Sequence, residues 1–533
     1  MDTVVLRGHL VKDWLNEAGW GPAQSTRVIR GTVVLRPAQP DGGPAAGGPP
    51  QGAGRRTKAE TDRLYAPEPT VVSRLSSYLE SCGLQMSPPL AHGLYLDFEG
   101  PLQAVVQAFH CAFVEKSVDG RSVYANREEP KVPLWAAPHV LAVLGLENRS
   151  AARPLYRYPT PEASPANGGQ GFYPQDLRTA YAYPAQLDGS GQTIGVLEFS
   201  NGYNIQDLTS YWTSHNITPP TVVFVSADGT PNDGGISSVD MECTLDLELA
   251  GAMAPGARLV VYEASGQGND AAFSVSLLKA VEAAIADETN NPSVLSISYG
   301  DAETHFQRSA LNAWDLAMQR AGTRGITVLV ASGDQGAYGL HGTGRPIRHS
   351  DAPASLPHVL AVGGTTLTLT PQMTRATEVG WTDTNNNGAS GGGVSVVFGL
   401  PSWQSEAGVP VNPSGAPGRG VPDVALNADP DTGYNVVFQG QATVVGGTSA
   451  ASPMWAALFA LINQSRAAKG LGPVGFVSTV LYKNGTGPEF HDIVEGNNSY
   501  NGVVGYSAGP GWDPVTGWGS VDGSALTVLF AGS

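Results

Sequence analysis

The chain has 533 residues, of which 41% are hydrophobic and only 14% are charged, and it contains 67 glycines and 40 prolines. This hydrophobic content excludes a largely disordered protein, and no apolar run reaches the roughly 18 residues that a membrane span requires. The formal net charge of −17 argues against a nucleic-acid-binding protein, because such proteins carry a basic face. We therefore expect neither nucleic acid nor a membrane as a partner.

The first part of the chain has the pattern of a small α+β unit. Strand-like segments span 27–36 and 92–98, and helical spacing of apolar residues marks 70–82 and 102–108. Residues 39–56 are rich in Gly, Pro and Ala, and this composition predicts a flexible loop.

A second stretch rich in Gly and Pro, 158–172, marks the predicted boundary between two domains. Residues 1–165 carry 17 basic and 16 acidic side chains, whereas residues 166–533 carry 13 and 31, so the negative charge lies in the second part. We predict one domain over 1–157 and another over 173–533, joined by this linker.

After the linker, aliphatic runs alternate with helical segments. Most of the runs lack a polar/apolar alternation, which is typical of strands buried on both faces of a parallel sheet. The predicted strands are 193–199, 221–225, 258–263, 294–299, 326–331 and 358–362, and the main predicted helices are 272–286 and 309–321. We predict an α/β fold with a doubly wound parallel sheet, whose ligands bind beyond the carboxyl ends of the strands.

The sequence GGTSAASPMWAAL, residues 446–458, contains the strongest candidate for a nucleophile. Small residues surround Ser449 at the predicted start of an apolar helix, where free backbone N–H groups and the helix dipole would stabilise an oxyanion. The alternative is that Thr448 or Ser449 merely caps the helix. A catalytic Ser449 also needs a base, because a serine hydroxyl is a weak nucleophile near neutral pH.

The segment 238–264 offers carboxyl groups for that role. Glu242 and Asp246 are four residues apart, which on a helix places them on one face with Cβ atoms about 6 Å apart. Two carboxyls so close together hold one proton over a range of acid pH. Glu242 would then accept the Ser449 proton, and Asp246 would hold Glu242 in place and share its charge.

The same segment also contains an alternation typical of a strand, at Leu245, Leu247 and Leu249. In a strand, Glu242 and Asp246 would lie about 13 Å apart and could not share a proton. The Ala-rich sequence AGAMA and the PGA that follows it favour a helix. An exposed acidic helix face without a catalytic role remains the alternative.

GTSAASP around Ser449, the E-x-x-x-D pair Glu242/Asp246 with AGAMAPGA behind it, and ASGDQG around Asp334 occur in one chain. Together they resemble the sedolisin family of serine-carboxyl peptidases, especially its kumamolisin-like branch, over residues 170–530. The resemblance implies a subtilisin-like fold, endopeptidase activity in acid and an N-terminal prodomain. It also implies the roles of nucleophile for Ser449, general base and acid for Glu242, its carboxyl partner for Asp246 and oxyanion-hole residue for Asp334. Because a carboxylate cannot donate a hydrogen bond, Asp334 must be protonated when the intermediate forms.

Further positions match the motifs of this family. Glu198 matches a glutamate that some kumamolisin-like members place behind the carboxyl pair, whereas Tyr299 stands where close relatives usually have tryptophan. The resemblance implies one structural Ca²⁺ ion, which suits a site built of oxygen ligands. Its ligands would be the carboxylates of Asp492 and Asp513 and the main-chain oxygens of Ile493, Gly509 and Gly511.

The resemblance also implies a zymogen that processes itself, with proteins or peptides as substrates and its own prodomain as intramolecular inhibitor. We expect cleavage within 158–172, with 39–56 as a second possible site, and we expect acid to weaken prodomain docking by protonating carboxylates of the second domain. The family implies a secreted protein, although the first 19 residues lack the basic and then apolar pattern of a signal peptide. A secreted protease of this kind has no evident need of a partner, so we expect a monomer.

Three other functions fit part of the sequence. His341-Gly342-Thr343 matches the histidine signature of ordinary subtilisin-like proteases, but it lies in a Gly-rich loop broken by Pro346 and follows Asp334 in the chain. A catalytically silent scaffold with the same fold would have no physical reason to keep all four candidate catalytic residues. An α/β-hydrolase esterase is disfavoured because Ser449 does not lie in a G-x-S-x-G turn.

Overall fold

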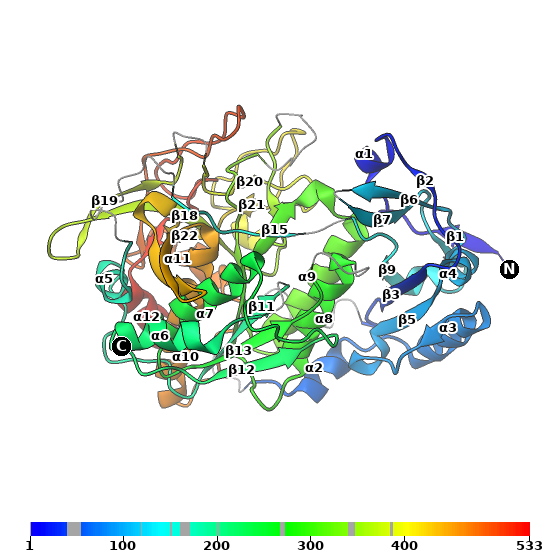
Figure 1. Cartoon of the computed structure of the whole chain (residues 1–533), viewed down its shortest axis with the longest axis horizontal. Coiled ribbons are helices and arrows are strands. Elements are labelled where there is room, and N and C mark those ends of the chain that lie inside the picture. The colour runs from blue at the N-terminus through cyan, green and yellow to red at the C-terminus, as the bar shows by residue number, and fades with distance from the viewer. Residues whose placement is uncertain are drawn as a thin grey trace.

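The computed structural model describes residues 2–39, 55–118, 120–149, 152–159, 171–199, 202–266, 272–338, 347–383 and 387–532. An N-terminal part, blue in Figure 1, lies beside a larger body that contains the rest of the chain. None of the helices in these ranges has the length and apolar composition of a bilayer-spanning segment. Cys82, Cys111 and Cys243 are buried and form no disulfide.

A four-stranded antiparallel sheet forms the centre of the N-terminal part. Its strands, in spatial order, are β4 (Gln85–Met86), β5 (Tyr95–Pro101), β3 (Val28–Leu35) and β9 (Val140–Leu144). Helices α3 (Pro69–Ser81) and α4 (Leu102–Phe109) contribute Leu75, Leu79 and Val105 to a core with the sheet. The predicted helices and the first predicted strand are confirmed. The second predicted strand, 92–98, begins only at Tyr95, because a 3₁₀ turn occupies Ala91–Gly93.

An eight-stranded sheet forms the centre of the larger body. Its order is β12-β13-β11-β14-β16-β18-β19, with β22 also paired to β18, and its neighbours are parallel except for the antiparallel pair β18 and β19. The strands are β11 (Thr193–Glu198), β12 (Val222–Ser226), β13 (Arg258–Glu263), β14 (Val294–Ile297), β16 (Thr327–Ala331), β18 (Leu360–Leu369), β19 (Arg375–Gly380) and β22 (Val424–Asn427). Every residue of β11, β14 and β16 is buried, which explains why these runs show no alternation. The predicted α/β fold is confirmed.

One predicted strand, 294–299, is divided in the structure. β14 ends at Ile297, and the chain then leaves the central sheet and forms β15 (Tyr299–Ala302). β15 lies between β10 (Arg153–Pro154) and β17 (Asp351–Ala352) in a separate antiparallel sheet. The apolar composition of the segment gave no sign of this change, since both strands are buried.

Helices cover both faces of the central sheet. On one face, α6 (Ile205–Ser214), α7 (Met241–Met253) and α10 (Thr448–Ala468) share a hydrophobic core. On the other face, α8 (Phe273–Ala286) and α9 (Arg308–Thr323) lie between the sheet and the N-terminal part (Figure 1). The N-terminal sheet packs on these two helices and places Val34, Tyr95 and Leu144 in their hydrophobic core.

A buried ion cluster joins the two parts. The Arg320 guanidinium of α9 is completely buried and lies 2.6 Å from Asp62 of α2 (Lys58–Leu64), which belongs to the N-terminal part. It also contacts Glu282 of α8 and donates a hydrogen bond to the Tyr95 hydroxyl, over 3.2 Å. The N-terminal part therefore supplies one of the two carboxylates that balance this charge.

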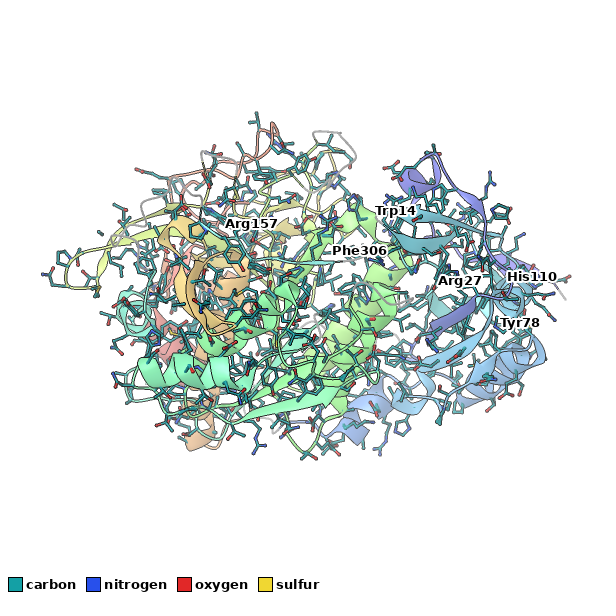
Figure 2. All side chains as sticks on the ribbon, viewed as in Figure 1. Trp14, Arg27, Tyr78, His110, Arg157 and Phe306 are labelled. Carbon is teal, nitrogen blue, oxygen red and sulfur yellow. The ribbon has the colours of Figure 1, made fainter. Side chains whose placement is uncertain are left out.

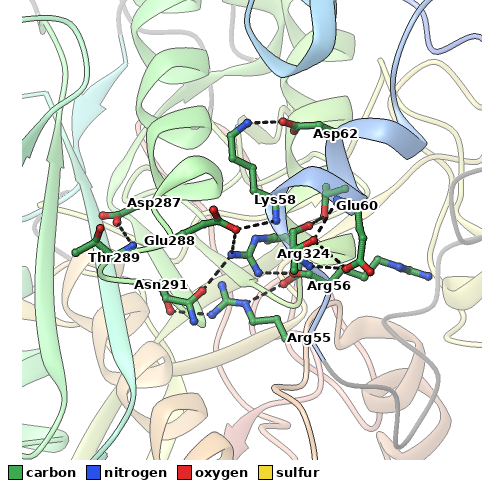
Figure 3. Close-up of polar contacts among 12 residues, drawn as sticks. Arg55, Arg56, Lys58, Glu60, Asp62, Asp287, Glu288, Thr289, Asn291 and Arg324 are labelled. Atoms are coloured by element: carbon green, nitrogen blue, oxygen red, sulfur yellow. Dashed lines mark hydrogen bonds and ion pairs between the residues drawn. The ribbon is translucent and has the colours of Figure 1, made fainter.

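Arg55 and the first residue of α2, Lys58, make further contacts with the larger body (Figure 3). Arg55 donates hydrogen bonds to the Arg324 and Asn291 carbonyls, over 3.1 and 2.8 Å. The backbone N–H of Lys58 donates to Glu288, over 3.3 Å. The start of α2 is thus fastened to the loop that follows α8.

Candidate active site

Ser449 lies in the first turn of α10, two residues after Gly447. Gly447 has φ = +111°, and a Cβ atom at this position would lie 2.3 Å from the Leu155 carbonyl oxygen, so both backbone conformation and space require glycine. Neither Thr448 nor Ser449 caps the helix, because Gly447 occupies the N-cap position without a side-chain hydrogen bond. Ser449 is completely buried, and its hydroxyl donates to the Ser298 carbonyl over 3.3 Å.

Glu242 and Asp246 lie one turn apart on α7, so the predicted helix is confirmed. All residues of α7 are buried, which explains why its leucines show no helical period and excludes an exposed acidic face. The Ser298 hydroxyl donates to the Asp246 carboxylate, whose two oxygens lie 3.0 and 2.8 Å away. Since the Ser298 carbonyl also accepts from Ser449, this one residue links the serine to the carboxyl pair.

Burial controls the protonation of this pair. It raises the pKa of Glu242 well above its usual range, the charge of Asp246 raises that pKa further, and the Ser449 hydroxyl opposes the shift. Burial also raises the pKa of Asp246, while the Ser298 hydroxyl and the Glu242 carboxyl oppose the shift. Burial together thus favours a state of the pair with one proton. Among the described residues, neither oxygen of Glu242 has a hydrogen-bond partner, because the Ser449 hydroxyl donates to the Ser298 carbonyl instead.

A third carboxyl, Glu198, lies at the carboxyl end of β11 behind the pair. It is completely buried, and the Tyr299 hydroxyl donates to it over 3.2 Å. Burial raises its pKa well above the usual range, and the charges of Asp246, Glu242 and Glu263 add to this effect. Glu263 is the register partner of Glu198 on β13. The structure thus brings the predicted Glu198 to the carboxyl pair and gives Tyr299 a hydrogen bond to it.

Asp334 follows β16 and faces the start of α10. Its Oδ1 accepts hydrogen bonds from the Thr448 N–H and hydroxyl, over 2.8 and 2.9 Å. Its Oδ2 has no hydrogen-bond partner among the described residues, and the Arg157 guanidinium lies 4.0 Å away. Burial raises the pKa of Asp334 to about 6, although Arg157 and the Thr448 bonds favour its ionised form.

The segment around Leu155 crosses this site as an extra strand. β10 pairs antiparallel with β15, and the Leu155 N–H donates to the Ser298 carbonyl over 3.1 Å. The Ser449 N–H donates to the Leu155 carbonyl over 3.0 Å. Beyond it, Arg157 and Gly446 exchange two backbone hydrogen bonds, over 2.9 and 2.8 Å. Figure 2 labels Arg157 within the larger body, far from the N-terminal sheet.

The predicted calcium ligands lie in loops near the C-terminus. Asp492 accepts a hydrogen bond from the Gly511 N–H over 2.9 Å, and Asp513 accepts one from the Gly509 N–H over 3.1 Å. Burial raises the pKa of Asp513 to about 6. Among the described residues, no group of three or more His, Cys, Asp and Glu side chains could hold a metal ion. A cation here would therefore depend on main-chain oxygens such as that of Ile493.

Sequence reasoning missed the residues that connect the site. Ser298 is a polar residue at the carboxyl end of an apolar strand, which is a signal that could have identified it. Leu155 and Arg157 carry no such signal, because their role depends on where a segment distant in sequence lies. His341 and most of the predicted processing segment 158–172 fall outside the described residues.

Comparison with known proteins agrees with this geometry. Residues 226–484 match the subtilase family, and residues 53–149 match the pro-kumamolisin activation domain. The chain is 38% identical to kumamolisin from Bacillus sp. (strain MN-32) over 98% of its length and 95% of that protein. It is 30% identical to sedolisin from Pseudomonas sp. (strain 101) over 87% of its length and 80% of that protein.

A solved structure of Pseudomonas sedolisin, described as a serine-carboxyl proteinase, superposes with a TM-score of 0.59 at 30% identity. The superposition covers 68% of this chain and all of the sedolisin chain. The larger body of this protein therefore has the subtilisin-like fold, and the N-terminal part is an activation domain. The chain belongs to the sedolisin family of serine-carboxyl peptidases, in its kumamolisin-like branch, and is a peptidase with an N-terminal prodomain.

Proposed function

We propose that this chain is the zymogen of an acid-active endopeptidase that cleaves peptide bonds through an acyl-enzyme on Ser449. The observation that supports the proposal most directly is that residues 153–157 of the chain itself run through the site. Backbone hydrogen bonds hold this segment on both sides of Ser449, at β15 and at Gly446. A cleft that holds backbone on both sides accepts the interior of a polypeptide, as an endopeptidase requires.

In the first step, the Ser449 hydroxyl oxygen attacks the substrate carbonyl carbon while Glu242 accepts the hydroxyl proton. Asp246 shares the negative charge of Glu242 before this transfer, because the two carboxyls are buried together, and the transfer leaves Glu242 neutral. Ser298 holds Asp246 in place through its hydroxyl. Glu242 then returns the proton to the leaving amine nitrogen, the C–N bond breaks and the acyl-enzyme remains.

The negative oxygen of the intermediate would receive two hydrogen bonds. The Ser449 N–H already points to the carbonyl oxygen of the segment in the site. Asp334 supplies the second bond from its Oδ2 only when that oxygen carries a proton. The pKa of Asp334, about 6, therefore predicts activity that rises as the pH falls below this value.

Hydrolysis of an unfolded protein substrate by the acid-activated chain tests the proposal. We expect activity at about pH 4 that is far higher than at about pH 7, with loss in Ser449→Ala and a decrease of about 10²–10⁴-fold in Glu242→Gln. Equal activity at both pH values, or full activity in Ser449→Ala, would contradict the proposal. Digestion of the substrate only from one end would contradict the endopeptidase assignment.

We further propose that the C-terminal loops bind one structural Ca²⁺ ion. Asp492 and Asp513 are carboxylates on loops tied to each other by the Gly511 amide, and Ile493, Gly509 and Gly511 would add main-chain oxygens. An all-oxygen set of this kind fits a hard cation. The ion would cross-link two loops and take no part in the chemistry.

A further inference from the structure

The backbone of residues 153–157 is held across the site in a defined register. Arg153 and Pro154 pair with Gly300 and Tyr299 on β15. On the other side, Arg157 exchanges two hydrogen bonds with Gly446. The two sets of backbone pairs therefore hold one stretch of chain at both ends, and the part between them lies against Ser449.

The carbonyl group within this stretch that lies at the serine is that of Leu155. Its oxygen lies 3.0 Å from the Ser449 nitrogen. The Leu155 oxygen, the Asp334 Oδ2 and the Tyr156 Cα lie within 2.3, 2.7 and 2.7 Å of one point, the position of a Cβ on Gly447. The Leu155 carbonyl thus occupies the position where an oxyanion would be stabilised, and Tyr156 follows it as the leaving residue.

Tyr156 is itself held on the leaving side. Its hydroxyl donates to the Ser238 carbonyl over 3.2 Å, just before α7. Its ring makes an edge contact with the ring of Tyr158 at a centroid distance of 5.7 Å. Both neighbours of the Leu155–Tyr156 bond are therefore fixed with respect to Ser449, as a reacting peptide must be.

The same segment also acts on the residue that must donate to the oxyanion. The Arg157 guanidinium, 4.0 Å from Asp334 Oδ2, favours the ionised carboxylate, and an ionised carboxylate cannot donate a hydrogen bond. Three other titratable groups interact electrostatically with Asp334, namely Glu242 on α7, Asp351 on β17 and Tyr500 in the C-terminal loops. Negative charge on Glu242 or Asp351 favours the protonated form of Asp334, so Arg157 is the positive charge that opposes it.

We propose that Leu155–Tyr156 is the first bond that this enzyme hydrolyses in its own chain, and that Arg157 delays the cut by keeping Asp334 ionised until the pH falls. This inference rests on the proposed function. The first cut would then lie on the N-terminal side of 158–172, the segment in which the sequence predicted cleavage. Residues 1–155 are then released from residues 156–533.

The cut follows the peptidase chemistry and needs no reagent besides water. The Ser449 oxygen forms an ester with the Leu155 carbonyl carbon, its proton passes to Glu242, and the C–N bond breaks as Glu242 protonates the Tyr156 nitrogen. Water then adds to the ester carbon, its proton passes to Glu242 and on to the Ser449 oxygen, and Leu155 leaves as a free carboxyl group.

Intact mass and N-terminal sequencing of the full chain, sampled over time after a shift from about pH 7 to about pH 4, test the bond. We expect a first pair of fragments that ends at Leu155 and begins at Tyr156, with no cleavage in Ser449→Ala. The rate per molecule should not change over a tenfold dilution, because bond and nucleophile belong to one chain. A first product that begins at any other residue would overturn the assignment.

Arg157→Gln tests the delay, with Arg153→Gln as the matched control. Both variants remove one positive charge from the same segment, but Arg153 is exposed and pairs with β15 through its backbone. We expect Arg157→Gln to raise the pH of half-maximal self-cleavage by roughly one unit, a tenfold change in the protonated fraction of Asp334, and Arg153→Gln to leave it unchanged. An unchanged midpoint in Arg157→Gln, or equal shifts in both variants, would exclude the role of Arg157.

Hydrolysis of an added protein substrate separates this inference from the proposed function. If the acid-treated chain digests that substrate through Ser449 but its first self-cleavage lies elsewhere, the inference fails and the proposed function stands. If neither the substrate nor the chain itself is cut in a Ser449-dependent manner, the proposed function fails as well.

Discussion

At the scale of single residues, the site contains buried acids whose proposed roles require protons. Asp334 is the clearest case, because its proposed role requires the protonated form whereas Arg157 and Thr448 favour the charged form. An asparagine in its place would donate a hydrogen bond at every pH. The proposed dependence of activity on acid would therefore have two sources, the carboxyl pair and the oxyanion hole, and they can be separated by substitution.

We expect Asp334→Ala to lower kcat by about 10²–10³-fold, the usual effect of removing one oxyanion-hole donor. Asp334→Asn should retain more activity than Asp334→Ala and should extend it to higher pH, since the limb near pH 6 disappears. Profiles of kcat against pH for the processed variants measure this. A limb near pH 6 that persists in Asp334→Asn would assign it to another group.

Tyr299 has a smaller expected effect. Its hydroxyl bond to Glu198 favours the ionised form of that carboxyl, so Tyr299→Phe should raise the pKa of Glu198 further. Because that pKa already lies well above its usual range, Glu198 is neutral in acid with or without this bond, and the low-pH limb of kcat should stay in place. We expect kcat at its optimum within about tenfold of wild type. A shift of the low-pH limb by about one unit or more would contradict this network.

At the scale of secondary-structure elements, the turn before α10 brings three separate segments together. Gly447 closely approaches Leu155 and Asp334, so a side chain there would displace both. Gly447→Ala should therefore abolish self-cleavage at acid pH. Gly415 offers a matched control, because it also has a positive φ, +82°, but no atoms lie within 4 Å of a Cβ there. Gly415→Ala should cost only about 1–2 kcal/mol of backbone strain and should process normally. Intact mass and circular dichroism distinguish loss of cleavage from loss of folding.

The C-terminal loops should respond to calcium. A chelator should lower the Tm of full-length Ser449→Ala by several degrees, because an ion present at about 100 times its Kd stabilises by about 2.7 kcal/mol. Asp513→Asn should have a lower Tm than its parent, and the chelator should change it little. A Tm that is independent of both chelator and added Ca²⁺ would exclude a structural ion.

The elements also show how far a sequence can predict this fold. Continuous buried runs identified β11, β13 and β16, and the spacing of Glu242 and Asp246 identified the carboxyl pair before its helix was known. The departure of β15 from the sheet was not predictable, because both it and β14 are buried and differ only in their partners. For the same reason, nothing local marked Leu155 as the residue at the serine, since its position depends on pairing with segments far along the chain.

At the scale of the whole molecule, the prodomain is held at several separate places. Arg320 takes one of its carboxylates from the prodomain, and Trp14 contacts His305 at a centroid distance of 6.3 Å, beside Phe306 (Figure 2). The Gly8 carbonyl accepts a hydrogen bond from the Ser309 N–H of α9, over 2.9 Å. Cutting one bond in the site would leave all of these contacts intact, so we expect release of the prodomain to need a second step that acid promotes.

His9 should contribute to that step. It is buried beside Gly8, and burial lowers its pKa from 6.5 to about 4. The folded prodomain therefore binds fewer protons than the unfolded one, and its stability should fall as the pH decreases from about 6.5 to about 4. His9→Gln should remove part of this acid sensitivity, whereas His110→Gln, exposed on the far side of the prodomain (Figure 2), should not. Unfolding of Ser449→Ala chains at several pH values measures both, and equal slopes in the two variants would exclude His9.

The backbone pairing at β15 and Gly446 limits which proteins can serve as substrates. A protein must offer about five consecutive residues of extended backbone with unpaired N–H and C=O groups before it can lie where residues 153–157 lie. Folded proteins keep nearly all such groups paired, so they are poor substrates. Acid loosens them by protonating the carboxylates that stabilise their folds. The acid that we propose to activate this enzyme would thus also unfold its substrates, and at neutral pH the inactive enzyme and the folded state of its substrates would both prevent cleavage.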